Sequence, residues 1–289
     1  MTSLQDRLTG RRFGLVLSAG YFGFFGHTGF LLGLAGRGLW PSAWAGTSAG
    51  GLVAAFGAAG ADLVQVESLL CSLERKQFWD PDWLGAGRDA LTRGHRATGL
   101  LAGRRFRSLL ERHLPVQTFE ACREPLLLVA ADLSQQSAHA MTRGDLASAV
   151  HATCAYPGMF QAVRRDRSLL WDGGLVDKAP ALALAAFARP KLDALLVHYL
   201  PSRDAATEPS GLFAWGKGMT QAVAALRKDH FQLQLQLLHE RGVEVHVVTS
   251  HLPPVTPKTL QAGREALKAG RASVEAALSR PPSAWTPSD

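Results

Sequence analysis

The stretch LWPSAWAGTSAGGLVAAFG, residues 39–57, places a serine between a short apolar run and an alanine-rich segment. Ser48 is the centre of a G-x-S-x-G pattern, with Gly46 and Gly50 on either side. Small residues at these positions let a strand and a helix approach closely, so that the serine projects from a strained corner. The backbone N–H groups after Ser48 begin the helix and favour negative charge beside them. The stretch therefore predicts either a nucleophilic serine or a strand-to-helix turn without chemistry.

The length and composition of the chain fit a large globular fold. Its 289 residues, 47% of them hydrophobic, can bury a substantial core. We expect one domain over residues 1–289, with a core at about 13–200 and the segment 210–280 packed on the same domain. The cysteines have no paired spacing and predict neither a disulfide framework nor a zinc site; they are Cys71, Cys122 and Cys154. We expect no metal and no cofactor.

Charge and hydropathy indicate the compartment and the partners. The first residues, MTSLQDRLTGRR, are polar, and no apolar stretch reaches membrane-spanning length. We therefore expect a cytoplasmic protein. The formal net charge of +7 favours anionic surfaces, either lipid head groups or nucleic acid. Because the sequence has no zinc-finger, RNP-like or basic-helix pattern, we expect no nucleic-acid partner.

A glycine-rich segment follows the first predicted strand. Residues 12–18, RFGLVLS, form a β-prone apolar run, and residues 19–26, AGYFGFFG, carry three glycines. Apolar residues then recur at helical spacing, which predicts a helix over 27–39. The dinucleotide pattern G-x-G-x-x-G is absent, so a nucleotide site is disfavoured. The alternative is an oxyanion hole, because a glycine-rich backbone presents its N–H groups without side-chain obstruction.

An arginine-rich segment follows a predicted helix at 61–75. The sequence FWDPDW, residues 78–83, ends that helix with aromatic residues and a proline. Seven arginines then crowd one stretch: Arg88, Arg93, Arg96, Arg104, Arg105, Arg107 and Arg112. A solvated helix face is the simpler interpretation. The other is a peripheral contact with an anionic membrane, in which the indole rings of Trp79 and Trp83 lie at the interface.

The rest of the chain alternates predicted strands and helices. Residues 125–133, PLLLVAADL, are typical of a central strand covered on both faces. Further strands are predicted at 137–141, 192–200 and 243–250, a hairpin at 160–171 turning at 164–167, and helices at 145–152 and 260–278. An apolar stripe at helical spacing lies between two of these strands; it consists of Met219, Val223, Leu226, Leu233 and Leu237. Part of it, FQLQLQLL, also alternates like a strand.

This alternation predicts a three-layer α/β/α fold with a mostly parallel central sheet. In such folds the loops at the C-terminal ends of the strands hold the functional site. The hairpin at 160–171 leads directly into the turn Asp172-Gly173-Gly174.

These motifs, in this order, resemble the patatin-like phospholipases, which are serine lipid acyl hydrolases with an α/β fold. In that family a strand and a G-G-G-x-R-G loop precede a helix that opens H-x-G, and a G-x-S-x-G elbow and a D-G-G or D-G-A turn follow. The resemblance covers roughly residues 13–200. The matching pieces are LVLS at 15–18, His27 with Gly29, GTSAG at 46–50, AVHATCAYPGMF at 149–160 and WDGGLVDKAP at 171–180.

The resemblance implies a catalytic dyad without histidine, with Ser48 as the nucleophile and Asp172 as its base. It also implies a lipid or small ester as substrate. A carboxylate with an ordinary pKa of about 4 is a weak base for a serine hydroxyl. The dyad therefore needs a short, partly dry hydrogen bond and an electropositive site for the oxyanion. Gly173 and Gly174 would let the backbone after the aspartate turn sharply.

The glycine loop departs from the family pattern. Gly20 keeps the glycine at the second position, but Gly23 replaces the family's basic residue. Because backbone N–H groups do not depend on side chains, Gly20 and Tyr21 still have the donors of an oxyanion hole. The aromatic side chains of the loop are expected to line an acyl pocket.

Three other functions fit parts of the sequence. A pseudo-hydrolase would bind lipid or a partner through the Trp/Arg segment without catalysis. An acyltransferase would pass the acyl group of the same intermediate to an acceptor other than water. An α/β-hydrolase would instead use a Ser-His-Asp triad, although that fold places several strands before its elbow and here only one clear and one short strand precede it. The histidines available to such a triad are His198, His230 and His246.

Overall fold

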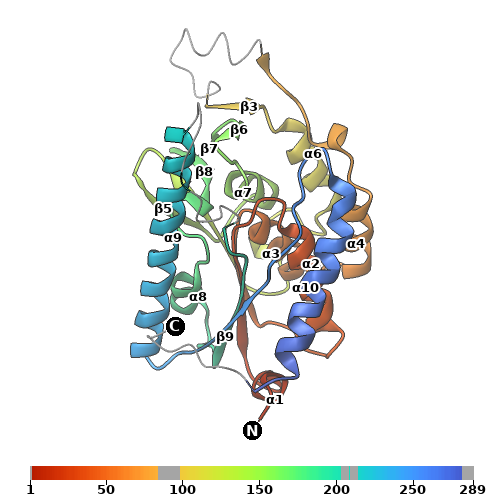
Figure 1. The fold of residues 1–289 in the computed structure, drawn as a ribbon, viewed down its shortest axis with the longest axis vertical. Helices are drawn as coiled ribbons and strands as arrows, with labels where there is room; N and C mark the ends of the chain where they lie inside the picture. The colour runs from red at the N-terminus through yellow and green to blue at the C-terminus, as the bar shows by residue number, and fades with distance from the viewer. Residues whose placement is uncertain (1, 84–97, 203–207, 209–213, 282–289) are drawn as a thin grey trace.

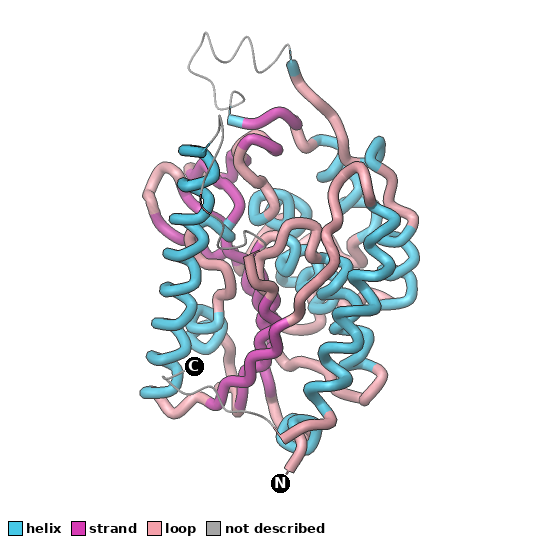
Figure 2. The backbone as a smooth tube through the Cα atoms, viewed as in Figure 1, coloured by secondary structure: helices cyan, strands magenta, loops and turns pink. Residues whose placement is uncertain are grey.

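The computed structural model describes residues 2–83, 98–202, 208 and 214–281. A sheet runs through the centre of the molecule and helices cover both of its faces, as the predicted three-layer fold requires (Figure 1). In Figure 2 the strands form a layer between two groups of helices. The prediction of an α/β fold with a mostly parallel sheet is confirmed.

The sheet has eight strands, most of them parallel. Its order is β10 (Glu244–Thr249), β9 (Ala194–Tyr199), β1 (Phe13–Leu17), β2 (Ala43–Thr47), β4 (Leu126–Asp132), β8 (Ser168–Asp172) and β7 (Val163–Arg165), and β5 (Ser137–Met141) also pairs with β4. The five strands from β10 to β4 are parallel. The strands β5, β7 and β8 pair antiparallel, and β7–β8 is the predicted hairpin.

The helices connect these strands. They are α1 (Leu4–Leu8), α2 (Phe24–Ala35), α3 (Ala49–Ala58), α4 (Leu63–Cys71), α6 (Arg104–His113), α7 (Leu146–Thr153), α8 (Ala181–Phe187), α9 (Ala214–Glu240) and α10 (Gly263–Leu278). A separate two-stranded sheet joins β3 (Gly99–Leu101) to β6 (Gly158–Phe160), which the sequence patterns did not predict. Helix α2 begins three residues earlier than expected, so the glycine loop ends at Gly23.

The alternation of side chains along the strands produces two cores. On one face, Leu15 and Leu17 of β1 join the core that contains residues of α2, α3 and α10. On the other face, Val16 joins the core formed with α8 and α9. Successive residues of a strand point to opposite sides, so a strand that is apolar throughout can be buried on both. Figure 1 shows α8 and α9 on one side of the sheet and α2, α3 and α10 on the other.

Helix α9 forms where the apolar stripe was predicted, but its buried side is a different one. Met219, Leu226 and Leu233 are 59%, 69% and 58% exposed. The buried side chains are Phe231, Gln234, Leu235 and Leu238. The ring of Phe231 stacks on Tyr199 with centroids 4.7 Å apart. The two stripes are adjacent on the helix, so periodicity alone did not show which one packs on the sheet.

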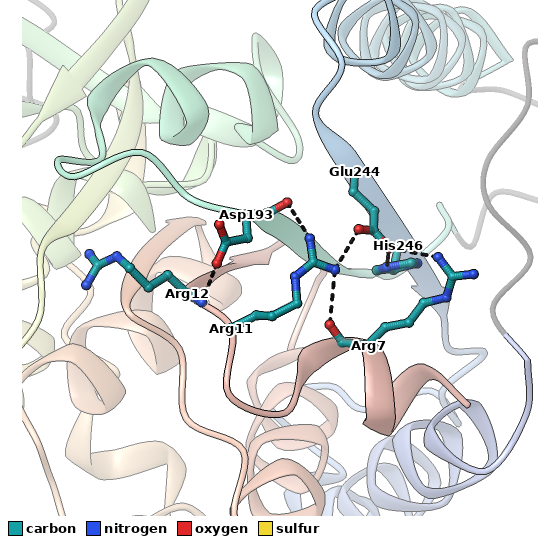
Figure 3. A network of polar contacts seen from close by, with 6 residues as sticks. All are labelled: Arg7, Arg11, Arg12, Asp193, Glu244 and His246. Carbon is teal, nitrogen blue, oxygen red and sulfur yellow. Dashed lines mark hydrogen bonds and ion pairs between the residues drawn. The ribbon is translucent and has the colours of Figure 1, made fainter. Parts of the chain in front are cut away.

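The polar N-terminal segment is tied to the edge of the sheet (Figure 3). Arg7 and Arg11 form ion pairs with Glu244 of β10 at 3.2 and 2.7 Å. The amide of Arg12 donates to the carboxylate of Asp193 at 2.9 Å. Leu4 and Leu8 of α1 are buried beneath these charges. Residues 4–12 are thus part of the folded structure, although their sequence alone indicated only a polar segment.

Candidate active site

Ser48 lies at a strained corner between β2 and α3. Its backbone has φ 55° and ψ −125°, a region that non-glycine residues seldom occupy. A methyl group on Gly46 would lie 2.6 Å from the carbonyl carbon of Gly50, and one on Gly50 would lie 2.1 Å from the carbonyl oxygen of Leu17. Only glycine fits at either position, because side chains there would displace backbone. The predicted elbow geometry is therefore present.

Asp172 at the end of β8 contacts Ser48 directly. The Ser48 hydroxyl donates to Oδ2 of Asp172 at 2.5 Å, across 124 residues of chain. Oδ1 accepts from the backbone N–H of Gly174 at 2.7 Å, so the D-G-G turn holds the carboxylate in place. Pairing of β8 with β4 brings Asp172 opposite Ala130, beside the strand that neighbours β2. The two residues of the predicted dyad are thus brought together.

The surroundings of Asp172 make it a stronger base than an ordinary carboxylate. Burial raises the pKa of Asp172 to about 6, because a charged carboxylate is poorly solvated there. Hydrogen bonds from Ser48 and Gly174 and the positive charge of Arg227 oppose the rise. The carboxyl is therefore mostly ionised at neutral pH, yet accepts a proton more readily than a surface aspartate.

The glycine loop lies beside this pair. Gly20, Tyr21, Ser48 and Asp172 line the same cavity. The loop is fixed by the N–H of Ala19, which donates to the Lys178 carbonyl, and by the N–H of Gly23, which donates back to Gly20. Among the described residues, neither Gly20 N–H nor Tyr21 N–H has a backbone or side-chain acceptor. Both donors are therefore available to an oxyanion.

A buried pair of histidines holds the start of this loop. Nε2 of His27 lies 2.8 Å from the Ser18 carbonyl oxygen, so it must carry the hydrogen. Burial lowers the pKa of His27 to about 4, so the ring is neutral and its Nδ1 is an acceptor. Nδ1 of His198, 2.9 Å away, must then donate, and its Nε2 accepts from the hydroxyl of Ser250 at 2.8 Å. With this assignment, every ring nitrogen of His27 and His198 has a hydrogen-bond partner. Both histidines are therefore positioning groups for the start of the loop.

The histidines of the alternative triad lie elsewhere. His198 is buried against His27, Nε2 of His246 donates to the Glu244 carboxylate at 2.9 Å at the sheet edge (Figure 3), and His230 lies 4.0 Å from Asp177. None of them lines the cavity that contains Ser48. Within the described part of the chain, no histidine hydrogen-bonds to Ser48 or Asp172. The geometry therefore favours the dyad over the triad.

Two residues that the sequence did not single out support the elbow. The backbone N–H of Ser48 donates to the hydroxyl of Thr153 at 2.9 Å, and that hydroxyl donates to the Val129 carbonyl. The Cys154 thiol donates to the Ser48 carbonyl oxygen at 3.2 Å. Both residues lie in the stretch 149–160, whose match to the family was the only available signal. Thr153 and Cys154 therefore hold the N–H group and the carbonyl group of the strained residue Ser48.

The cavity has a volume of about 570 Å³ and is mostly apolar. Its wall includes the aromatic residues of the loop, as expected for an acyl pocket, together with residues from α3, α4 and α6. The phenylalanines of the wall are Phe22, Phe24, Phe56, Phe78, Phe106 and Phe160. Two cations also line it, Lys178 and Arg227, which the sequence did not indicate. A flexible apolar chain with a polar end fits such a space.

The arginine-rich segment is only partly within the described residues. Arg88, Arg93 and Arg96 lie outside them. Arg105 donates to the carbonyls of Lys76 and Trp79, and Arg107 pairs with Glu111 at 2.8 Å. These partners agree with the simpler interpretation of a helix face for this part of the segment. None of the described helices combines the length and apolar composition needed to cross a bilayer.

A sequence model described as patatin-like phospholipase matches residues 15–185, which include Ser48, Asp172 and the glycine loop. The chain belongs to the patatin-like phospholipase family. Its resemblance to that family, noted from the motifs, is thereby confirmed.

Relatives of this patatin-like chain include proteins of mycobacteria. An uncharacterized NTE family protein of Mycobacterium tuberculosis (strain CDC 1551 / Oshkosh) is 31% identical over 185 residues, which are 64% of this chain and 30% of the relative. A second, from Mycobacterium bovis (strain ATCC BAA-935 / AF2122/97), is 31% identical over 187 residues with the same shares. The chain thus spans about 30% of the length of these relatives.

Solved structures with a similar course of the chain include two bacterial proteins. VipD from Legionella pneumophila has 14% identity and a TM-score of 0.49, with 93% of this chain and 66% of that chain covered. The complex of ExoU with SpcU from Pseudomonas aeruginosa contains a chain with 14% identity and a TM-score of 0.46, with 93% and 53% covered.

Proposed function

We propose that this patatin-like protein is a serine lipid acyl hydrolase that cleaves carboxylic esters through an acyl-enzyme on Ser48, with Asp172 as general base. The observation that carries the proposal is the 2.5 Å hydrogen bond from the Ser48 hydroxyl to a buried carboxylate, inside an apolar cavity. A short bond to a desolvated base is what a weak nucleophile requires.

The first half of the reaction forms the acyl-enzyme. Oγ of Ser48 attacks the ester carbonyl carbon while its proton moves to Oδ2 of Asp172. The carbonyl oxygen becomes an oxyanion, which the backbone N–H groups of Gly20 and Tyr21 stabilise. The tetrahedral intermediate then expels the alcohol, which takes the proton from Asp172. The carboxylate returns to its ionised form and the acyl group stays on Ser48.

The second half releases the acid. A water molecule gives a proton to Asp172 and attacks the acyl carbon, and the oxyanion again lies at Gly20 and Tyr21. Collapse of this intermediate returns the proton to Oγ of Ser48 and frees the carboxylic acid. An alcohol in place of water would make the reaction an acyl transfer. The strained backbone at Ser48 keeps Oγ at the corner in both halves.

The test is the Ser48→Ala variant with a screen of esters. We expect it to lose roughly 10³-fold or more of the rate on p-nitrophenyl esters, phospholipids or lysophospholipids, because the nucleophile is gone and only binding remains. A fluorophosphonate should label the parent at Ser48 and leave the variant unlabelled. Ser279→Ala, at the exposed end of α10, is the matched control. Equal turnover in the two variants would refute the proposal.

A further inference from the structure

Lys178 is a buried cation for which the described residues supply no carboxylate partner. The residue is 4% exposed, and its ammonium group donates to the Ser202 hydroxyl at 3.2 Å and lies 4.7 Å from the centre of the Tyr199 ring. Among the described residues no carboxylate lies within 4 Å of it. Burial, and then the charge of Arg227, lowers the pKa of Lys178 to about 7. The site would therefore hold this charge better with an anion present.

Arg227 on α9 is a second cation with unused donors. Its Nη1 donates to the Gly174 carbonyl at 3.0 Å, which leaves the other nitrogens of the guanidinium. The Nε atom is buried and has no hydrogen-bond partner in the part of the chain that the structure describes. An unpaired buried donor destabilises the protein, so a ligand that accepts a hydrogen bond from it would be stabilised.

Both cations lie beside the candidate dyad. They line the cavity that contains Ser48 and Asp172. A methyl group built on Gly174 would lie 2.9 Å from Oδ1 of Asp172 and 4.0 Å from Nη1 of Arg227, so the guanidinium is close to the carboxylate. An anion bound by Arg227 would therefore lie near the ester bond that is cleaved. An anionic group far along an acyl chain would not meet this condition.

We propose that Lys178 and Arg227 form a subsite for the phosphate of a lipid head group, which holds a glycerophospholipid or lysophospholipid with its ester at Ser48. A guanidinium offers parallel N–H donors that match two phosphate oxygens, and an ammonium adds a compact charge. In glycerophospholipids the phosphate and the ester are separated by only the glycerol carbons. The aromatic wall then receives the acyl chain. This subsite rests on the proposed hydrolase function.

The first experiment compares two substrates with the same acyl chain. Lysophosphatidic acid carries the phosphate and monoacylglycerol lacks it, so the ratio of their kcat/KM values measures the subsite alone. We expect Lys178→Met and Arg227→Gln each to lower this ratio roughly 10- to 100-fold, as for loss of a charge-assisted hydrogen bond. The control is Lys228→Gln, an exposed cation adjacent to Arg227 on α9, which should keep the ratio. A ratio unchanged in both test variants would overturn the proposal.

The second experiment measures binding without turnover. Glycerol 3-phosphate should raise the melting temperature of Ser48→Ala protein, and the rise should shrink when Lys178→Met or Arg227→Gln is added. Lys178→Met keeps the side-chain volume and removes a costly buried charge, so we expect it to fold. An equal rise with acetate would overturn the assignment to phosphate. Binding without ester cleavage by the parent would instead refute the hydrolase and keep the subsite, so the two failures are distinguishable.

Discussion

At the scale of single residues, the environment of Asp172 explains how a carboxylate could activate a serine without a histidine. Burial raises the pKa of Asp172 towards neutrality, and the hydrogen bond from Gly174 leaves Oδ2 directed at Ser48. A histidine base has a pKa of about 6.5 in water, and Asp172 reaches about 6. A histidine in water and the buried Asp172 are thus bases of similar strength.

The pH dependence of the rate tests this role of Asp172. The base must be ionised, so kcat/KM of the parent should rise with pH through about 6 and then level off. Asp172→Asn keeps the shape but cannot accept the proton, so activity should fall by about 10² to 10⁴. The measurement is a pH–rate profile with a neutral p-nitrophenyl ester. A profile that is flat between pH 5 and 8 in the parent would contradict the assignment.

The same shift predicts a cost in stability. The folded state holds the Asp172 proton up to about pH 6, whereas the unfolded state releases it near pH 3.8, the ordinary pKa of an aspartate. Stability from this group is therefore present below about pH 4 and is lost as pH rises to about 6. A tenfold change in the acid dissociation constant corresponds to about 1.4 kcal/mol. Asp172→Asn should accordingly unfold with a free energy roughly 2–3 kcal/mol higher than the parent at pH 7, measured by denaturant titration, and equal to it at pH 4.

The sequence could indicate the residues of the dyad but not those that surround them. Ser48 lies in a G-x-S-x-G pattern that points to a nucleophile, and the role of Asp172 was implied by the resemblance to the family, so both could be predicted before the fold. Thr153 and Arg227 carry no such motif. They meet the site only because α7 and α9 pack beside it, and such tertiary contacts have no periodicity or spacing in the chain.

At the scale of elements, the glycine loop after β1 is held by hydrogen bonds from neighbouring elements. The His27–His198 pair holds the Ser18 carbonyl, and the Leu200 amide donates to the Ser18 hydroxyl at 2.8 Å. The loop is thus fixed by α2 and by the end of β9. The amides of Gly20 and Tyr21 follow directly after this hydrogen-bonded segment.

Two variants of this loop separate its donors from its side chains. Tyr21→Ala keeps the N–H group, so it should change mainly the preference for acyl length. Gly20→Pro removes an N–H group and fixes φ, so it should reduce turnover of all substrates by roughly 10² or more. The measurement is kcat/KM over a series of acyl lengths, for proteins shown to melt like the parent. Loss of activity confined to long chains in Gly20→Pro would contradict the oxyanion assignment.

Helix α9 shows which features of an element the sequence can predict and which it cannot. Its existence followed from the spacing of apolar residues, but the side that packs on the sheet did not. Gln234 lies on the buried side because its amide accepts from the Leu182 N–H and donates to Asp177. A polar residue satisfied in this way cannot be distinguished from an exposed one by hydropathy. Four residues of the predicted stripe are correspondingly exposed: Met219, Leu226, Leu233 and Leu237.

At the scale of the whole molecule, the strand order brings the parts of the site together: the parallel strands carry Ser48 and the glycine loop, and the antiparallel strand β8 carries Asp172. Ser48 follows β2, the glycine loop follows β1, and Lys178 and Arg227 come from segments packed against the end of β9. The C-terminal ends of neighbouring parallel strands meet at the same edge, so motifs far apart in sequence become neighbours. This is why the segments after β1 and β2 lie side by side, whereas Asp172 reaches them through the antiparallel pairing of β8 with β4.

The net charge of +7 predicts a peripheral contact of the protein with anionic membranes. We expect this contact to form through α6 and the indole of Trp83, which is 70% exposed. Arg104 and Arg112 on α6 have no ion-pair partner among the described residues, so their charges are available. Each arginine near an anionic surface contributes about 1 kcal/mol. We expect the double variant Arg104→Gln/Arg112→Gln to bind phosphatidylserine vesicles roughly 5- to 30-fold more weakly in co-sedimentation at low salt, with Lys258→Gln as control. Since salt screens exposed charges, equal binding to neutral and anionic vesicles at low and high salt would exclude this contact.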